Sequence, residues 1–545
     1  MLKKIILFFN CIFIFTLVDA QIPKFTHQDT LRGSITKERE WWDLTYYHLN
    51  VKVNIKEHAL TGENEIYYKV LKSSQTMQID LQPPMQITKV LMDSIPLNYK
   101  RDGNAYFIDI VAKQNIGDIN HLTVYYDGKP HVSKRPPWEG GITWKKDNNG
   151  KDFISTTCQG DGASLWWPCK DHMYDKPDSM LISVTIPEPL MNVSNGRLRS
   201  LIHNADSTNT SNWFVSNPIS NYCVNINIGD YVHFSEVYKG EDGALDCNYF
   251  VLRDNLEKAK KQFKEVPRML EAFEHWFGPY PFYKDGYKLV EVTYPGMEHQ
   301  SSVTYGNGFE NGYGGRDVSH TGLGMKFDFI IVHESGHEWF ANNITYKDIA
   351  DMWIHESFTA YSENLFLNYF FDKQASADYV IGTRANIRND KPIIGFYNVN
   401  NEGSGDMYYK GANMLHTLRQ IVNDDEKWRN ILRGLNKEFY HQTVTSAQIE
   451  NYMSKAVGID LSKVFDQYLR DARIPVLEYT VNNKKFKYRW TNCVAGFNMS
   501  VKLFIDNKIV WFSPTENWQD MSVENDKVKV EAPIDFYIKT KVMTK

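Results

Sequence analysis

Residues 330–337 read IIVHESGH, and residues 353–356 read WIHE. On a helix, His333 and His337 lie four residues apart on one face, so both imidazoles can reach the same metal ion. Glu334, one step around that helix, would then face the water at the metal. A hydrolytic zinc ion usually has three protein ligands and one open position, and Glu356 is the natural third ligand. We therefore predict one zinc ion per chain.

The residues around this motif indicate two buried helices. Large apolar side chains come before His333 and after His337, which suits a helix that is buried on most sides. The second segment has Glu356, Ala360 and Glu363 at helical spacing, so its two carboxylates share one face. Glu363 would orient a metal-binding histidine from behind. In the simpler alternative, His333 and His337 are hydrogen-bonded core residues that bind no metal. The presence of Glu356 downstream disfavours this alternative.

The first twenty residues have the features of a secretory signal peptide. A short basic region precedes an apolar run over residues 5–18, and small residues end at Ala20, where cleavage would occur. The run is shorter than the roughly twenty residues of a membrane span, although an uncleaved anchor is the alternative. We predict an exported protein, periplasmic or secreted, whose mature chain begins near Gln21.

The remaining chain has the composition of a folded protein with several domains. Hydrophobic residues make up 42% of the sequence, and no later segment is apolar enough to span a membrane. A formal net charge of −5 without a basic cluster makes nucleic acid a poor partner. The five cysteines after the leader are too few for a disulfide scaffold, although one or two bridges are compatible with the sequence.

The hydrophobic period changes twice and divides the chain after residues 1–20 into three domains. Apolar and polar residues alternate in several early segments, which predicts an antiparallel β domain over residues 21–237. Apolar residues three and four apart then predict an amphipathic helix over residues 256–273, within a mostly helical domain at 238–473. Period two returns afterwards, so we expect a small β-sandwich over residues 474–545. The fold class is multidomain α+β.

Two local motifs mark the boundaries of expected elements. Residues 445–448 read TSAQ, the pattern of a helical capping box. Asn482 and Asn483 separate two alternating segments and predict the turn of a β-hairpin.

Four motifs together resemble the zinc aminopeptidase family that contains aminopeptidase N and leukotriene hydrolase. H-E-x-x-H is followed after eighteen residues by a glutamate, as in that family. Residues 295–299 (PGMEH) resemble the family's G-x-M-E-N, and residues 408–412 (YYKGA) resemble its Y-x-K-G-A. Gln159, nine residues before Pro168, resembles the amine-binding glutamine ahead of the family's F-P-C segment. The resemblance covers residues 40–475.

This resemblance implies a thermolysin-like catalytic domain with an assigned metal centre. His333, His337 and Glu356 would bind zinc. Glu334 would take a proton from the water at the metal and later pass it to the leaving amine.

The resemblance also implies the residues that bind the substrate. Glu298, with Gln159 beside it, would hold the free α-ammonium group of a peptide, and Tyr408 would donate its hydroxyl to the oxyanion. Gly296 would contact the substrate main chain, and Met297 together with Gln159 would line the pocket for the first side chain. With Glu298 at the end of the cleft to bind the terminal amine, the enzyme would remove one residue at a time.

The sequence differs from the family pattern at several positions, and each difference leads to an expectation about the site. Pro295 stands where glycine is common and removes one backbone N–H. His299 replaces the usual asparagine; it could still donate to a substrate carbonyl, and its protonation would then add a pH dependence. Ser357 follows the third ligand where glycine is common, a change that we expect to be tolerated. The chain ends without the long helical domain of larger relatives, so we expect a more open cleft.

Four functions compete, and the motifs favour a zinc aminopeptidase whose partners are peptides with a free N-terminus. A thermolysin-like endopeptidase would have no use for Glu298 at an amine pocket. A lipid epoxide hydrolase needs a deep apolar channel, which a sequence does not reveal. A non-catalytic peptide-binding protein would usually have lost a ligand or the base, and this chain keeps them. The sequence determines neither the preferred first residue nor the oligomeric state.

Overall fold

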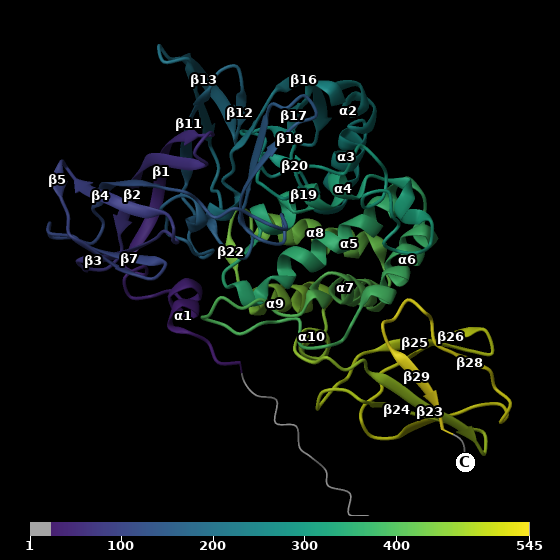
Figure 1. Cartoon of the computed structure of the whole chain (residues 1–545). Helices are drawn as coiled ribbons and strands as arrows, with labels where there is room; N and C mark the ends of the chain where they lie inside the picture. Colours follow the sequence, from purple (N-terminus) through teal and green to yellow (C-terminus); the bar gives the residue numbers. More distant parts are fainter. Residues whose placement is uncertain (1–22, 544–545) are drawn as a thin grey trace, which may run out of the picture.

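The computed structural model describes residues 23–543. The signal peptide that we predict for residues 1–20 lies outside this range. A β-rich region, a mostly helical region and a second, smaller β region follow one another along the chain and lie in a row (Figure 1). This confirms the predicted α+β architecture. Within the described range, no helix combines the length and the apolar character needed to cross a membrane.

The N-terminal region consists of α1 (His27–Gly33) and a series of β-strands. The strands are β1 (Trp42–Asn54), β2 (Ala59–Val70), β3 (Thr76–Asp80), β4 (Gln86–Met92), β5 (Ile95–Pro96), β6 (Tyr99–Asp102), β7 (Ala105–Asp109), β8 (Ile119–Gly128), β9 (Gly141–Lys146), β10 (Asp152–Thr157), β11 (Ser179–Pro187), β12 (Met191–Val193), β13 (Arg197–His203), β14 (Thr208–Val215) and β15 (Asn227–Gly229). Leu49 and Val51 of β1 are fully buried while Lys52 is exposed, as period two predicts. The eight-stranded sheet has the order β13-β14-β11-β1-β2-β8-β4-β5, and only its β1–β11 pair is parallel.

A five-stranded sheet connects this region to the helices. Its strands are β16 (Tyr231–Gly240), β17 (Gly243–Leu252), β18 (Tyr287–Glu291), β19 (Gly296–Met297) and β20 (Val303–Tyr305), in the order β16-β17-β18-β20-β19. Strand pairing therefore continues across residue 237, where we place a domain boundary, and the boundary itself stays a prediction.

The predicted helix over residues 256–273 is two helices, α2 (Leu256–Gln262) and α3 (Glu265–Phe277). Pro267 explains the break, because it has no N–H to donate to the carbonyl of Phe263, four residues earlier. The further helices are α4 (Phe329–Gly336), α5 (Trp353–Phe370), α6 (Lys373–Gly382), α7 (Tyr409–Val422), α8 (Asp425–Glu438), α9 (Ser446–Val457) and α10 (Ser462–Leu469), with the short strands β21 (Thr345–Tyr346) and β22 (Thr443–Val444) beside them.

The predicted capping box is confirmed. Thr445 accepts a hydrogen bond from the backbone N–H of Gln448, and the Gln448 side chain accepts one from the backbone N–H of Thr445. This reciprocal pair satisfies two donors at the start of α9 that have no partner within the helix.

The C-terminal region forms two small sheets. Its strands are β23 (Val476–Asn482), β24 (Lys485–Thr491), β25 (Val501–Ile505), β26 (Lys508–Phe512), β27 (Gln519–Ser522), β28 (Val530–Glu531) and β29 (Lys539–Val542). The hairpin turn lies one residue later than predicted, at Asn483 and Lys484, which both have positive φ as a type I′ turn requires.

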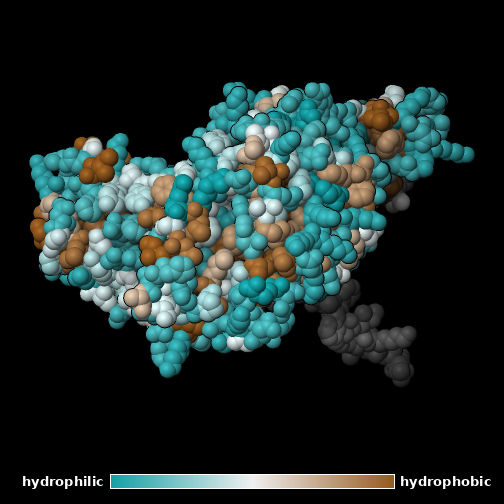
Figure 2. Space-filling view, turned by 90° about the horizontal axis from the view of Figure 1, so that it is seen from above, coloured by the Kyte–Doolittle hydropathy of each residue, from teal (hydrophilic) through white to brown (hydrophobic). Residues whose placement is uncertain are grey.

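Two hydrophobic cores hold these regions together. One lies within the N-terminal sheets, and the other runs from the five-stranded sheet through the helices into the C-terminal sheets. All five cysteines of the described range are buried with free thiols, so the disulfides that the sequence permits do not form there. On the face drawn in Figure 2, hydrophobic residues form separate patches on a largely hydrophilic surface.

Candidate active site

The helices α4 and α5 carry the predicted metal ligands. Asp328 begins α4, because its carboxylate accepts hydrogen bonds from the backbone N–H groups of Ile330 and Ile331. The helix ends at Gly336, and His337 follows with φ −65° and ψ −17°, so it keeps its helical position relative to His333. Both histidines therefore project from one side of a short, buried helix.

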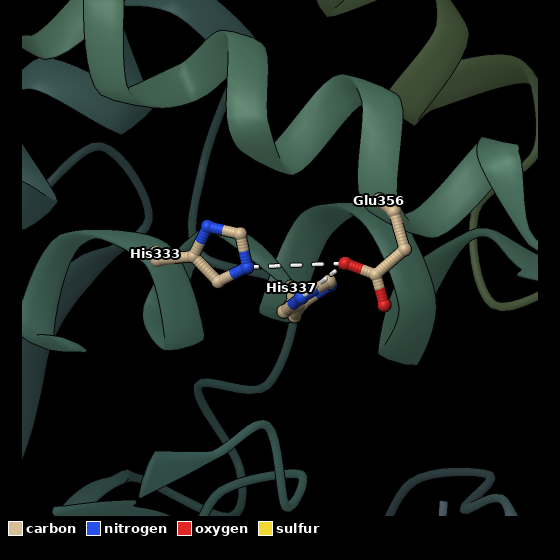
Figure 3. Close-up of side chains that lie close together, drawn as sticks. All are labelled: His333, His337 and Glu356. Carbon is tan, nitrogen blue, oxygen red and sulfur yellow. Dashed lines mark ion pairs between the residues drawn. The ribbon is translucent and has the colours of Figure 1, made fainter. Parts of the chain in front are cut away.

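His333, His337 and Glu356 converge on one point. Glu356 Oε2 lies 3.4 Å from His337 Nε2 and 3.8 Å from His333 Nε2. Figure 3 shows both imidazoles pointing toward this oxygen of Glu356, which lies on the neighbouring helix α5. One ligand atom from each of the three residues lies within 4.8 Å of the others, a spacing at which a single ion can contact all three.

The Nδ1 atom of each imidazole lies within hydrogen-bond distance of an oxygen atom. Glu363 Oε1 lies 2.7 Å from His333 Nδ1, and Tyr379 donates its hydroxyl to the other oxygen of Glu363 at 2.5 Å. The backbone carbonyl oxygen of Phe340 lies 3.0 Å from His337 Nδ1. These contacts fix both rings so that each Nε2 faces Glu356, the arrangement that metal-binding histidines use.

The donor set fits a zinc ion. Glu356 is 1% exposed, and its Oε2 has no hydrogen-bond partner among the described residues. A buried carboxylate oxygen without a partner is costly unless a cation satisfies it. Two imidazole nitrogens and one carboxylate oxygen form one of the ligand sets that catalytic zinc takes, and this set leaves a further position open.

Glu334 lies beside this point, on the wall of a cavity. Burial raises the pKa of its carboxyl group to about 7, although His333 opposes the shift. A bound cation would also lower the pKa of Glu334. The backbone at Gly296 passes close to Glu334, because a Cβ added there would lie 3.1 Å from Glu334 Cγ and 2.5 Å from Ile330 Cγ2. Only glycine fits at position 296.

A second pair of side chains meets next to the three ligands. Gln159 donates to Glu298 Oε1 at 2.7 Å and to Glu356 Oε1 at 3.1 Å. Tyr222, which the sequence does not single out, donates its hydroxyl to Glu298 Oε1 at 3.2 Å. Glu298 is only 2% exposed, and burial raises the pKa of its carboxyl group. An incoming cationic group would stabilise this carboxylate in its charged form.

Tyr408 stands at the start of α7 and also lines the cavity. The centre of its ring lies 6.1 Å from that of His333, and its hydroxyl makes no hydrogen bond to any described residue. Ser357 fixes the preceding turn by donating to the carbonyl of Met407 at 2.6 Å. A Cβ at position 411 would lie 1.9 Å from Ser357 Oγ, so Gly411 lets α7 approach α5.

A cavity of about 520 Å³ joins these groups. Its wall contains nine of the residues that we predict to touch zinc or substrate: Gln159, Gly296, Met297, Glu298, His333, Glu334, His337, Glu356 and Tyr408. Glu363 lies behind His333 and does not line the cavity, as expected of a residue that only orients a ligand.

One expectation for this region is wrong. His299 is fully buried, does not line the cavity, and cannot donate to a substrate carbonyl there. The chain turns into the core directly after Glu298, where Ser302 N donates to His299 O at 2.9 Å. Burial lowers the pKa of His299 to about 3, so the side chain stays neutral at ordinary pH.

The cavity wall also contains residues that no sequence motif identifies. Trp138, Tyr313 and Glu402 lie on loops outside the motifs, and no local pattern points to them. Phe329 could have been found, because it precedes His333 by one helical turn and stacks on it with ring centres 5.1 Å apart.

Comparisons with known proteins agree with this arrangement. A sequence model of the Peptidase M1 N-terminal domain matches residues 44–223, and a model of the Peptidase family M1 domain matches residues 262–468. The two matches follow each other along the chain and contain all of the predicted site residues.

Curated relatives are distant and longer. "Probable aminopeptidase 2" of Sulfurisphaera tokodaii is 23% identical over 480 residues, which are 82% of this chain and 59% of the relative. "Endoplasmic reticulum aminopeptidase 1" of Mus musculus is 23% identical over 447 residues, or 78% of this chain and 47% of the relative. The chain thus spans about half of the length of the curated relatives it matches.

A solved structure shares the fold. The M1 zinc metallopeptidase of Deinococcus radiodurans, in a mutant form bound to a Tyr-Ser-Ala substrate, superposes with a TM-score of 0.66 at 18% identity. The match covers 79% of this chain and 95% of the other. With both of its characteristic domains matched in order, the chain belongs to the peptidase M1 family.

Proposed function

We propose that this protein is a zinc-dependent aminopeptidase that removes the first residue from peptides with a free N-terminus. The observation that carries the proposal is the bridge made by Gln159, which contacts both Glu298 and the metal-ligand candidate Glu356. One amide side chain thus joins a group suited to an ammonium ion with a group suited to zinc.

His333, His337 and Glu356 would hold the zinc ion. A zinc ion in such a site lowers the pKa of its water and polarises the carbonyl of the scissile bond. The protein orients the two imidazoles through Glu363 and the carbonyl of Phe340.

Glu334 is the general base of the proposed reaction. Its carboxylate takes a proton from the attacking water and then passes that proton to the amine that leaves. Its position on the cavity wall, directly after His333 and three residues before His337 in the chain, supports this role. The low-dielectric surroundings that raise its pKa also suit a group that must both accept and release a proton.

Tyr408 and Glu298 complete the proposed site. The free hydroxyl of Tyr408 donates to the oxygen on which negative charge develops. Glu298 accepts the α-ammonium group, with Gln159 holding the carboxylate in place. Since Gln159 reaches from Glu298 to Glu356, only one residue fits between the ammonium group and the scissile bond.

We also place the protein outside the cytoplasm. The basic, apolar and small-residue segments of residues 1–20 support export with cleavage near Ala20. N-terminal sequencing of the protein purified from its native host tests this placement, with Gln21 as the expected first residue.

The test of function compares a free-amine peptide with its N-acetylated twin. Each is incubated with the wild-type protein and with Glu334→Gln, after chelation and after zinc is restored. We expect zinc-dependent release of the first residue from the free peptide alone, and loss of that release in the variant.

Other outcomes point to other functions. Equal cleavage of both twins would identify an endopeptidase and remove the proposed role of Glu298. No cleavage of either twin by the zinc-loaded protein would contradict the proposal and favour a lipid substrate or a peptide-binding function.

A further inference from the structure

The wall of the active-site cavity is acidic. Four carboxylates line it, those of Glu298, Glu334, Glu356 and Glu402, and no lysine or arginine of the described range does so. The first three have roles in the proposed function, and Glu402 has none. A carboxylate on a substrate-binding wall without a role in the reaction is a candidate for substrate selection.

Glu402 lies at the end of the cavity where the substrate amine would bind. Asn400, two residues earlier, donates its side-chain N–H to the carbonyl of Gly160 at 3.4 Å, and Gly160 directly follows Gln159. Two loops that are 240 residues apart in sequence therefore meet beside the amine-binding pair. The first side chain of a bound peptide leaves the same carbon atom as the ammonium group, so it points into this region.

The loop that carries Glu402 is held tightly. A Cβ at Gly403 would lie 1.5 Å from the carbonyl oxygen of Ile393, and one at Gly395 would lie 2.2 Å from that of Asn401. The N–H of Gly395 also donates to the carbonyl of Ala350 at 3.0 Å. These backbone contacts fix where the Glu402 side chain starts, which a specificity residue requires.

The charge of Glu402 has no partner. Its carboxylate makes no ion pair within 4.0 Å among the described residues. Burial and the negative charges of Glu356 and Asp161 raise its pKa, while Lys391 alone of the cations opposes this. Glu402 is exposed to solvent, so a cationic substrate group would relieve mainly the repulsion by the neighbouring carboxylates.

An aromatic side chain lines the same cavity. Trp138 lines the cavity and is 71% exposed. Its loop is tied to the loop of Gln159, because Gly140 N donates to Asp161 Oδ2 at 2.6 Å. A tryptophan face beside carboxylates binds guanidinium groups well.

We propose that this site prefers peptides whose first residue is basic, arginine above all, and that Glu402 is the residue that selects it. This rests on the proposed aminopeptidase function. The ammonium group of the first residue would bind at Glu298, and its guanidinium group would lie between Glu402 and Trp138. An acidic first residue would meet four carboxylates and be rejected.

The test uses peptides that differ only in the charge of the first side chain. Arg-Ala-Ala is compared with citrulline-Ala-Ala, in which a neutral urea replaces the guanidinium group at the same length. We expect kcat/KM to be about fivefold higher for arginine, which corresponds to about 1 kcal/mol, the upper end for an exposed ion pair. Raising the salt concentration should reduce this ratio.

Two variants assign the effect to Glu402. Glu402→Gln should bring the arginine-to-citrulline ratio close to one, and Glu402→Lys should invert it. Glu524→Gln removes the same charge from an exposed position in the C-terminal region and should leave the ratio unchanged.

The outcomes separate the two proposals. If the wild-type protein releases citrulline and arginine equally well, the specificity proposal is overturned and the aminopeptidase function stands. If Glu402→Gln keeps the wild-type ratio of kcat/KM for the arginine and citrulline peptides, Glu402 is not the residue that selects arginine. Release of no first residue from either peptide overturns the function and this inference together.

Discussion

The two ends of the active-site cavity are built in different ways. At the metal end, His333, His337 and Glu356 lie within 24 residues of one another on two packed helices. At the amine end, Gln159 meets Glu298 across 139 residues of sequence, and Asn400 meets Gly160 across 240. In the proposed function, helices carry the metal ligands, and loops from three parts of the chain would surround the first side chain of the substrate.

The difference teaches which features a sequence can reveal. Helical spacing fixes the relative positions of side chains three and four residues apart, so a metal site on helices has a readable pattern. Loop contacts depend on the packing of the whole domain, and they tolerate change more easily. We therefore expect substitutions at the metal end to affect the rate of the reaction, and substitutions at the amine end to affect the choice of substrate.

The largest effect is expected at the metal end. Glu334→Gln removes the general base but keeps the size of the side chain, so kcat should fall about 1,000-fold or more. Zinc content, measured by mass spectrometry of the purified protein, should stay at one ion per chain. A variant that keeps more than a tenth of the activity would show that another group takes the proton.

Tyr408 lies where the metal end meets the loop before α7. Tyr408→Phe removes one donor to the oxyanion, so kcat should fall about 100-fold while KM changes little. Steady-state kinetics on a free-amine peptide measures both. Tyr409→Phe is the matched control, because it removes a hydroxyl from the neighbouring residue and should leave kcat within a factor of about three.

Much of the metal end could be predicted from the sequence. The four-residue step from His333 to His337 and the seven-residue step from Glu356 to Glu363 are helical repeats, and the structure has helices at both places. Alternation in the early segments similarly predicts the strands. The break after Gln262 was missed, although Pro267 is a local signal for it.

The amine end could be predicted only in part. Gln159 and Glu298 were found through a family resemblance, and the hydrogen bond between them supplies the physical reason. Trp138 and Glu402 had no signal, because loop closure over hundreds of residues brings them to the cavity. His299 was misplaced because a motif gives the order of residues and not the point at which the chain enters the core.

Glu298→Gln tests the amine end directly. The variant keeps the shape of the side chain but loses the charge that would hold the substrate ammonium group. KM for a free-amine peptide should rise about 30-fold, which corresponds to about 2 kcal/mol for a buried charged contact. The preference for the free amine over its acetylated twin should fall by a similar factor. An unchanged preference would assign the ammonium group to another residue.

Glu363→Gln tests how far the metal end depends on its supporting contacts. The amide can still bind His333 Nδ1 but lacks the charge that makes the imidazole more basic, so zinc affinity should fall about tenfold. Competition with a fluorescent chelator measures this affinity. Gln374→Glu, an exposed change on the neighbouring helix α6, should leave zinc affinity the same.

His299→Asn should have the smallest effect on activity, although it changes a residue next to Glu298. His299 is buried and neutral, so kcat/KM and its pH profile between pH 5 and 9 should match those of the wild type. Stability should respond instead. The pKa of His299 is about 3 in the folded protein and about 6.5 when unfolded, so the wild type loses stability as pH falls below about 6.5. The drop in Tm from pH 7 to pH 5 should therefore be smaller in the variant. A shifted activity profile would place His299 in contact with the substrate after all.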